Sequence, residues 1–171
     1  LYGDQNEEMG FSFSEKTKAE KKVGMQFAIA RYFNTTLNCP AIKSLTEDPI
    51  LWDIATRYLG FKPVFTGVNM WWSFANEDIL ENQRSNYAQL YHHDVDDYAF
   101  LKFFFYLTDV DKLDGPHVCV KGSHNKKKLN YQYSIRRYDD LEINRDYSSE
   151  NVLDIEGVQG FGFAEDTYCI H

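Results

Sequence analysis

The feature that most constrains the fold of this chain is a change in the pattern of apolar residues after Gly60. Before it, apolar residues recur at helical spacing. After it, short runs rich in Val, Phe, Tyr and Trp alternate with turn residues, which is typical of strands. We expect strands near residues 63–74, 87–95, 99–109, 116–121, 152–156, 159–164 and 167–171. Many short strands after a helical start predict a mainly β fold, a β-sandwich or jelly-roll barrel with flanking helices.

Two helix signals precede Gly60. Thr17 and Glu20 have the spacing of a capping box, in which each side chain bonds a backbone N–H of the first turn. Asp48 before Pro49 predicts an N-cap followed by proline in the first turn. Gly60 then predicts the end of that second helix.

These signals predict a single domain over residues 1–171, with N-terminal helices at about 15–60 and a jelly-roll core at about 61–171. The segment 122–151 is charged and poorly periodic, so we expect it to be an excursion over the rim. Both ends are expected to be trimmed, the C-terminal end above all, because the chain begins without Met and stops abruptly at His171.

Composition limits the partners. The 171 residues carry 18 Lys and Arg against 26 Asp and Glu, a formal net charge of −8. This acidic balance argues against nucleic acid, which favours basic surfaces. No apolar run approaches the roughly 18 residues that span a bilayer, so no membrane association is expected. We expect a small-molecule partner, and nothing in the sequence predicts an oligomeric state.

Cysteine usage predicts the compartment. The chain has Cys39, Cys119 and Cys169, an odd number with neither a CxxC spacing nor a disulfide framework. Free thiols are typical of reducing compartments, so we expect a cytoplasmic protein.

The stretch Tyr91–Asp97, YHHDVDD, contains the strongest chemical signal. On a strand, residues two apart face the same side, so His92 and Asp94 point together and His93 points away. One His and one carboxylate make two thirds of a 2-His-1-carboxylate site, which suits non-haem Fe(II). The alternative is a solvated polar turn.

The second histidine must come from elsewhere in the chain. His171 closes an apolar run on an expected late strand, where a jelly roll brings chain-distant strands together. His124 lies in a Gly-Ser-His turn, which favours solvent exposure, whereas His117 fits either a core or a ligand role. A ligand beyond the end of the chain is a further alternative.

The residues around this stretch resemble the phytanoyl-CoA dioxygenase family. The resemblance covers about residues 60–171, and the blocks that carry it are Gln89–Asp97, Leu101–Val110, Gly115–Pro116, Lys121–His124 and Gly160–His171. It implies a double-stranded β-helix, the cupin-like jelly roll. It further implies Fe(II) held by His92, Asp94 and His171, with 2-oxoglutarate as co-substrate and O2 as oxidant.

The chain departs from the family pattern in three places. Tyr91 replaces a common Trp, and Lys121 replaces the Pro of a P-G-S-H motif. The family also carries an Arg downstream of the distal His, which pairs with the far carboxylate of 2-oxoglutarate. Either this Arg lies beyond His171, or the co-substrate binds differently.

Five other residues are candidates for co-substrate contacts by their position next to the motif. They are Met70, Trp72, Gln89, Lys102 and Phe104. A Lys is unusual in so apolar a strand, because Lys is rarely buried unpaired. Lys102 therefore either meets a carboxylate in the pocket or extends its ammonium to the surface.

The combined pattern predicts an Fe(II)- and 2-oxoglutarate-dependent dioxygenase. The reaction expected is hydroxylation of a small organic or lipid-like substrate, with release of succinate and CO2. Two alternatives stay open: a metal-dependent hydrolase, since Zn²⁺ accepts the same ligands, and a non-catalytic binding protein on the same jelly-roll fold.

Overall fold

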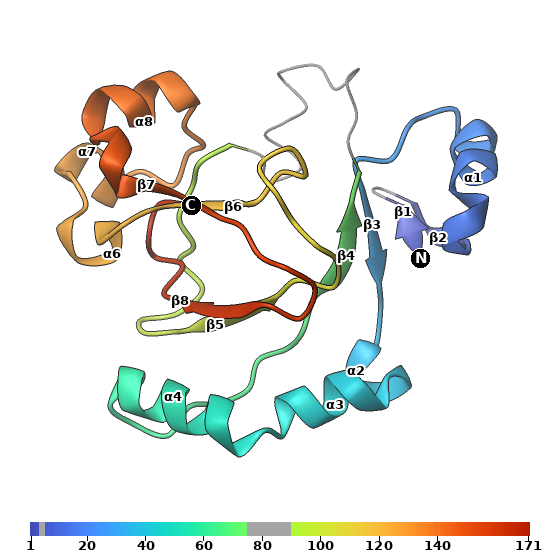
Figure 1. Ribbon diagram of the computed structural model, residues 1–171, viewed down its shortest axis with the longest axis horizontal. Helices are drawn as coiled ribbons and strands as arrows, with labels where there is room; N and C mark the ends of the chain where they lie inside the picture. The colour runs from blue at the N-terminus through green and yellow to red at the C-terminus, as the bar shows by residue number, and fades with distance from the viewer. Residues whose placement is uncertain (4–5, 75–89) are drawn as a thin grey trace. The chain divides into compact units, whose positions relative to one another are not determined.

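The computed structural model describes residues 1–3, 6–74 and 90–171, and the chain divides into two units (Figure 1). The first unit is Leu1–Gln83 and the second is Arg84–His171. Each unit has its own sheet elements and its own buried apolar cluster, and each is described by itself below.

The first unit contains a four-stranded antiparallel sheet in the order β2-β1-β3-β4. The strands are β1 (Tyr2–Gly3), β2 (Asn6–Gly10), β3 (Ile29–Tyr32) and β4 (Met70–Ser73). The 3-10 helix η1 (Phe13–Glu15) and helix α1 (Lys16–Val23) follow β2. The apolar cluster of this unit consists of Phe11, Ala19, Phe27 and Ala30.

The predicted capping box lies inside α1 rather than at its start. Ser12, before η1, donates from its hydroxyl and backbone N–H to the Glu15 carboxylate, at 2.8 and 3.4 Å. Glu20 instead accepts from the Lys16 ammonium at 2.6 Å and from the N–H of Phe27 at 2.8 Å. Its carboxylate thereby ties α1 to the segment that leads into β3.

Three helices connect β3 to β4: α2 (Thr35–Asn38), α3 (Pro40–Thr46) and α4 (Pro49–Leu59). The predicted ends of α4 are confirmed, because Asp48 accepts from the N–H groups of Ile50 and Leu51 and Gly60 ends the helix at φ 77°. Within the described ranges, no helix is long and apolar enough to cross a bilayer.

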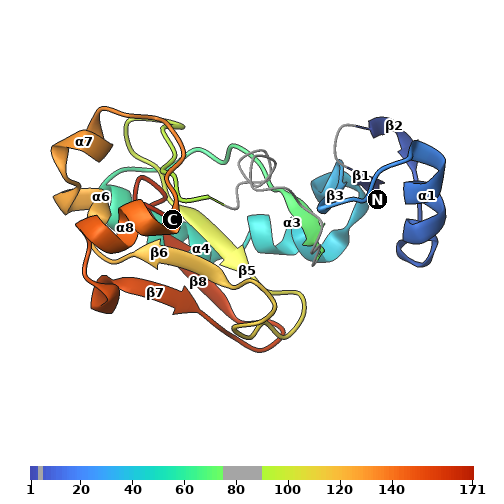
Figure 2. The ribbon, with the colours of Figure 1, turned by 90° about the horizontal axis from the view of Figure 1, so that it is seen from above.

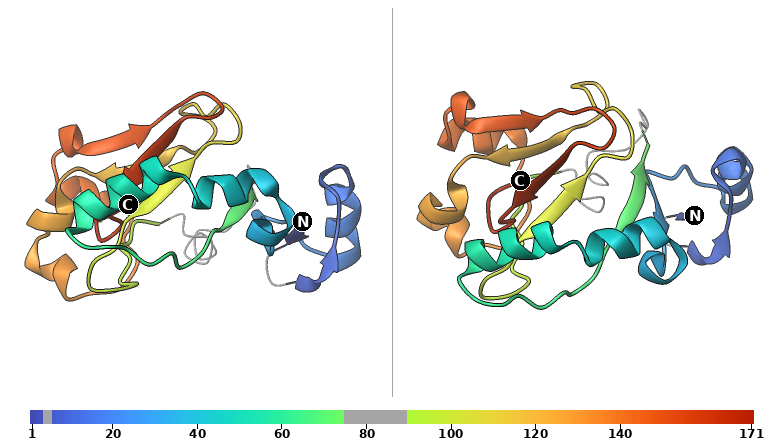
Figure 3. Two further views of the ribbon diagram at one scale, coloured as in Figure 1. Left: turned by 90° about the horizontal axis from the view of Figure 1, so that it is seen from below. Right: turned by 60° about the horizontal axis from the view of Figure 1, so that its bottom comes forward.

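The second unit is built from two antiparallel ribbons and short helices. β5 (Lys102–Phe105) pairs with β8 (Gly162–Glu165), and β6 (His117–Val120) pairs with β7 (Val152–Ile155). Figure 3 shows β6 beside β8, so the two ribbons are neighbours. The helices are α6 (Ser123–Lys126), α7 (Leu129–Gln132) and α8 (Asp140–Asp146), with the 3-10 turn η3 (Ser149–Asn151). The helices gather at one end of the ribbons (Figures 1 and 2).

The segment 122–151 contributes to the core instead of forming an excursion over a rim. Tyr131, Tyr138 and Ile143 from this segment are almost fully buried, and they cluster with Val120 and Ile170. The rings of Tyr131 and Tyr138 pack in a tilted arrangement, with their centroids 4.5 Å apart and an interplanar angle of 54°.

The prediction of a mainly β fold with a double-stranded β-helix is wrong. The described residues have more helix than strand, and the second unit has only two-stranded ribbons, with no closed barrel among the described residues. Expected strands shorten to four residues at 70–73, 102–105, 117–120, 152–155 and 162–165, and none forms at 90–95 or 167–171. The physical reason is that Tyr131, Tyr138 and Tyr147 pack on one another in a segment of short helices and turns, and strand propensity depends strongly on such context.

Candidate metal centre

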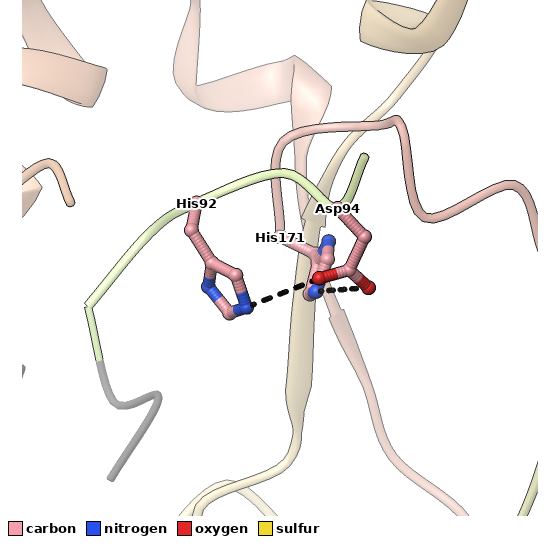
Figure 4. Close-up of side chains that lie close together, drawn as sticks. All are labelled: His92, Asp94 and His171. Carbon is pink, nitrogen blue, oxygen red and sulfur yellow. Dashed lines mark ion pairs between the residues drawn. The ribbon is translucent and has the colours of Figure 1, made fainter. Parts of the chain in front are cut away.

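Two chain-distant segments bring the predicted metal ligands together. His92 and His171 exchange both backbone N–H to carbonyl hydrogen bonds, each 2.8 Å long, as paired residues of antiparallel strands do. The N–H of Asp94 donates to the carbonyl of Thr167 at 2.8 Å. This pairing places the side chains of His92, Asp94 and His171 in one cluster (Figure 4).

The three side chains present their donor atoms to a common point. His92 Nε2 lies 3.8 Å from Asp94 Oδ1, and His171 Nε2 lies 3.8 Å from Asp94 Oδ2 (Figure 4). The ligand atoms of all three residues lie within 4.8 Å of one another. Two imidazole nitrogens and one carboxylate therefore converge, which is the donor set of a 2-His-1-carboxylate site.

Backbone carbonyls orient both imidazole rings in the same way. His92 Nδ1 lies 3.0 Å from the carbonyl oxygen of Leu90, and His171 Nδ1 lies 3.0 Å from that of Cys169. Only a protonated nitrogen can donate to a carbonyl, so Nδ1 carries the proton in both rings. The lone pair of Nε2 is then directed at Asp94, as in histidines that bind metals.

The electrostatics favour neutral histidines. Burial, followed by the neighbouring His171 and the charge of Arg137, lowers the pKa of His92 to about 4. Burial also lowers the pKa of His171. Burial raises the pKa of the Asp94 carboxyl, but the hydrogen bond from Lys102 and the other attractive contacts outweigh it and hold that pKa below its usual value. At neutral pH the site thus offers two neutral imidazoles and one carboxylate.

Lys102 meets a carboxylate, and that carboxylate belongs to the cluster. Its Nζ lies 2.7 Å from Asp94 Oδ2 and 2.7 Å from Asp96 Oδ2. The ammonium is therefore already paired with two acidic side chains. It compensates the charge of Asp94 rather than standing free for a co-substrate carboxylate.

The other predicted co-substrate residues have different surroundings. The ring of Phe104 stacks on Phe163 at 5.0 Å and lies 4.9 Å from the ring of His117. Met70 and Trp72 lie on β4 of the first unit, where Trp72 packs on Phe13. Gln89 lies outside the described residues.

The remaining histidines are not in the cluster. His93 is buried, and its ring meets Tyr168 edge-on at 5.3 Å. His117 Nε2 pairs with Glu165 Oε2 at 2.6 Å, and His124 contacts the neighbouring Asn125. Of the alternatives for the third ligand within the chain, only His171 lies beside His92 and Asp94.

One basic residue that the sequence did not single out also lies near the cluster. Tyr138 bridges to Tyr91, donating its N–H to the Tyr91 carbonyl at 2.8 Å, which brings Arg137 alongside His92. Arg137 Nη1 is buried and has no hydrogen-bond partner, and its charge is one of the causes that lower the pKa of His92. No feature of the sequence distinguishes Arg137 from the adjacent Arg136, whose guanidinium pairs with Glu142 in the structure.

Comparisons with known proteins found no counterpart for this chain. No family model, no curated protein and no solved structure matches it.

Proposed function

We propose that this chain is an Fe(II)- and 2-oxoglutarate-dependent dioxygenase that hydroxylates a small organic or lipid-like substrate. The observation that carries the proposal is the convergence of His92, Asp94 and His171 with both Nδ1 atoms bonded to backbone carbonyls. The ordered motifs that resemble the phytanoyl-CoA dioxygenase family support the same chemistry. The proposal makes no use of a closed barrel.

The donor set fits Fe(II). Neutral imidazole and carboxylate ligands suit this ion, and three protein ligands leave positions for a chelating co-substrate and O2. When bound, Fe(II) supplies the oxidation in which 2-oxoglutarate, O2 and a substrate C–H bond become succinate, CO2 and an alcohol.

The chain's own residues have the task of holding the ligands in place. The carbonyls of Leu90 and Cys169 fix the tautomer and orientation of the two rings, and the paired backbones of His92 and His171 fix their separation. Lys102 keeps Asp94 ionised and oriented through its 2.7 Å contact with Oδ2.

Arg137 supports the co-substrate part of the proposal. A buried guanidinium nitrogen without a partner is costly, and a carboxylate is the acceptor that guanidinium groups bind most strongly. We propose that Arg137 pairs with a carboxylate of 2-oxoglutarate. This assigns the anchoring role within the described chain, in place of the Arg expected downstream of the distal His.

The proposed setting is a reducing, cytoplasmic compartment with a small-molecule substrate and no nucleic-acid or membrane partner. Cys39, Cys119 and Cys169 are all free thiols, which supports the reducing environment. The net charge of −8 supports the absence of a polyanionic partner.

The test is an anaerobic titration of the purified chain with Fe(II) and then 2-oxoglutarate, followed by visible absorbance. A weak charge-transfer band should appear only with both present, and it should vanish in His171→Ala but persist in the matched control His124→Ala. Admission of O2 should then yield succinate. Bound iron without a band would refute the proposal, and O2-independent turnover with Zn²⁺ would favour the hydrolase.

A further inference from the structure

A second group of metal-ligating side chains lies in the same unit. Cys119 Sγ, Cys169 Sγ and a carboxylate oxygen of Glu165 lie within 4.8 Å of one another. The three residues are 8%, 5% and 9% exposed, so the group is almost fully buried. None of them belongs to the His92, Asp94 and His171 cluster.

The neighbouring ribbons bring these residues together. Cys119 lies on β6, Glu165 is the last residue of β8, and Cys169 follows the turn in which its N–H donates to Asp166. The backbone hydrogen bond from Val120 to Ile170, 2.7 Å long, holds this last segment against β6. The group therefore joins β6 to the segment 165–169, which is far from it in sequence.

The carboxylate of Glu165 is incompletely satisfied. Its Oε2 lies 2.6 Å from His117 Nε2, whereas Oε1 is buried and has no hydrogen-bond partner. Buried polar atoms in native proteins nearly always have a partner, so an orphaned carboxylate oxygen beside two thiols indicates a missing ligand. A carboxylate oxygen accepts from a hydrogen-bond donor or binds a cation, and the two thiols beside Glu165 favour a metal cation.

We propose that Cys119, Cys169 and Glu165 bind one Zn²⁺ ion. Thiolates prefer soft or borderline ions, and cysteine thiolates and Glu carboxylates are both ligands that zinc accepts. With Zn–S bonds of about 2.3 Å, tetrahedral ligand atoms lie about 3.8 Å apart, so a small adjustment of side chains closes the site. Binding converts two thiols to thiolates and releases two protons to solvent.

The Cys169 thiol donates to the carbonyl of Val120 at 2.9 Å, and zinc binding would replace this hydrogen bond by a metal–sulfur bond. The hydroxyl oxygen of Ser123 accepts from the N–H of Ile170 at 2.7 Å, so its own proton is available to Cys169 Sγ, 3.0 Å away, and would stabilise the thiolate. His117 holds the other oxygen of Glu165, as outer partners of metal ligands do. The carbonyl of Cys169 also orients His171, so zinc would stabilise the segment that presents this histidine.

This proposal does not depend on the proposed oxygenase activity, and its test separates the two. The full chain, stripped of metal by a chelator, is titrated with Co²⁺, whose thiolate charge-transfer band in the near ultraviolet reports cysteine ligation only. The band should appear in the wild type and in His92→Ala. It should be lost in Cys119→Ser and Cys169→Ser, and it should be retained in Cys39→Ser, the matched control from the first unit.

Glu165→Gln provides a second measurement that keeps both thiols. It should weaken Co²⁺ binding by about 10- to 100-fold, the usual cost of disturbing a metal site. Zn²⁺ should raise the Tm of the wild type more than that of this variant.

Three results would overturn the proposal. They are a folded wild type without a thiolate band, a Glu165→Gln variant with unchanged affinity, and a single titratable thiol in the denatured chain. The last would mean that two of the three cysteines form a disulfide, and Cys119 and Cys169 are the pair that lies close enough to do so.

Discussion

Replacing Arg137 by Gln tests the assignment of the co-substrate anchor. The buried Nη1 of Arg137 has no partner in the described structure, so it is available to one carboxylate oxygen of 2-oxoglutarate. A hydrogen bond between charged groups contributes about 1.5–3 kcal/mol, and tenfold in affinity is about 1.4 kcal/mol. We therefore expect Arg137→Gln to raise the Kd for 2-oxoglutarate by about 10- to 150-fold.

The adjacent Arg136 is the matched control. It is 55% exposed and pairs with Glu142, and such surface pairs contribute about 0–1 kcal/mol to stability. Arg136→Gln should leave the Kd for 2-oxoglutarate unchanged. The assay for both variants is the anaerobic titration of the Fe(II)-loaded chain, followed by the charge-transfer absorbance.

Stability separates an anchoring role from a structural one. Because Arg137 Nη1 is buried without a partner, its charge costs free energy in the ligand-free chain. Arg137→Gln should therefore leave Tm unchanged or raise it. A lowered Tm, or a Kd equal to that of Arg136→Gln, would refute the reasoning.

Three further predictions concern the triad, the core and one half-buried lysine. Asp94→Asn should weaken Fe(II) binding by at least about 100-fold in calorimetry, whereas Asp97→Asn, at an exposed carboxylate outside the cluster, should not. Ile143→Ala, at a fully buried core position, should lower the free energy of unfolding by about 2–5 kcal/mol in urea, against less than about 0.5 kcal/mol for Ile135→Ala at an 80% exposed position. Burial lowers the pKa of Lys127 to about 8, from a usual value of 10.5. Between pH 8 and pH 10.5, Lys127 keeps its proton in the unfolded chain but has released it in the folded chain. The free energy of unfolding, measured in urea, should therefore rise with pH over this range. Lys127→Met should remove the part of this rise that is due to Lys127.

The sequence predicted part of the candidate site because the signals involved are local. His92 and Asp94 are two residues apart, and in an extended backbone this spacing directs both side chains to one side. The residues alone left several histidines open, and the family resemblance implied His171; the backbone pairing of residues 92 and 171 places it beside His92.

The charged neighbours of the site were not predictable in the same way. Lys102 was expected to meet a carboxylate in the pocket or to extend to the surface, and the carboxylates that it meets are those of Asp94 and Asp96. Arg137 lies in a segment that was expected to be an excursion over the rim. The buried pair of Cys119 and Cys169 was interpreted only as a sign of a reducing compartment. Each of these roles depends on which distant segments approach one another.

By itself the sequence determined features that depend on a few consecutive residues. The ends of α4 follow from Asp48 and Gly60, since an N-cap and a left-handed C-terminal residue act within one helical turn. Tertiary structure decided the strand lengths, the absence of a closed barrel among the described residues, and the surroundings of His171 and Glu165. The reason is that strand pairing, burial and charge compensation are properties of contacts between segments far apart in the chain, and a local pattern does not specify those partners.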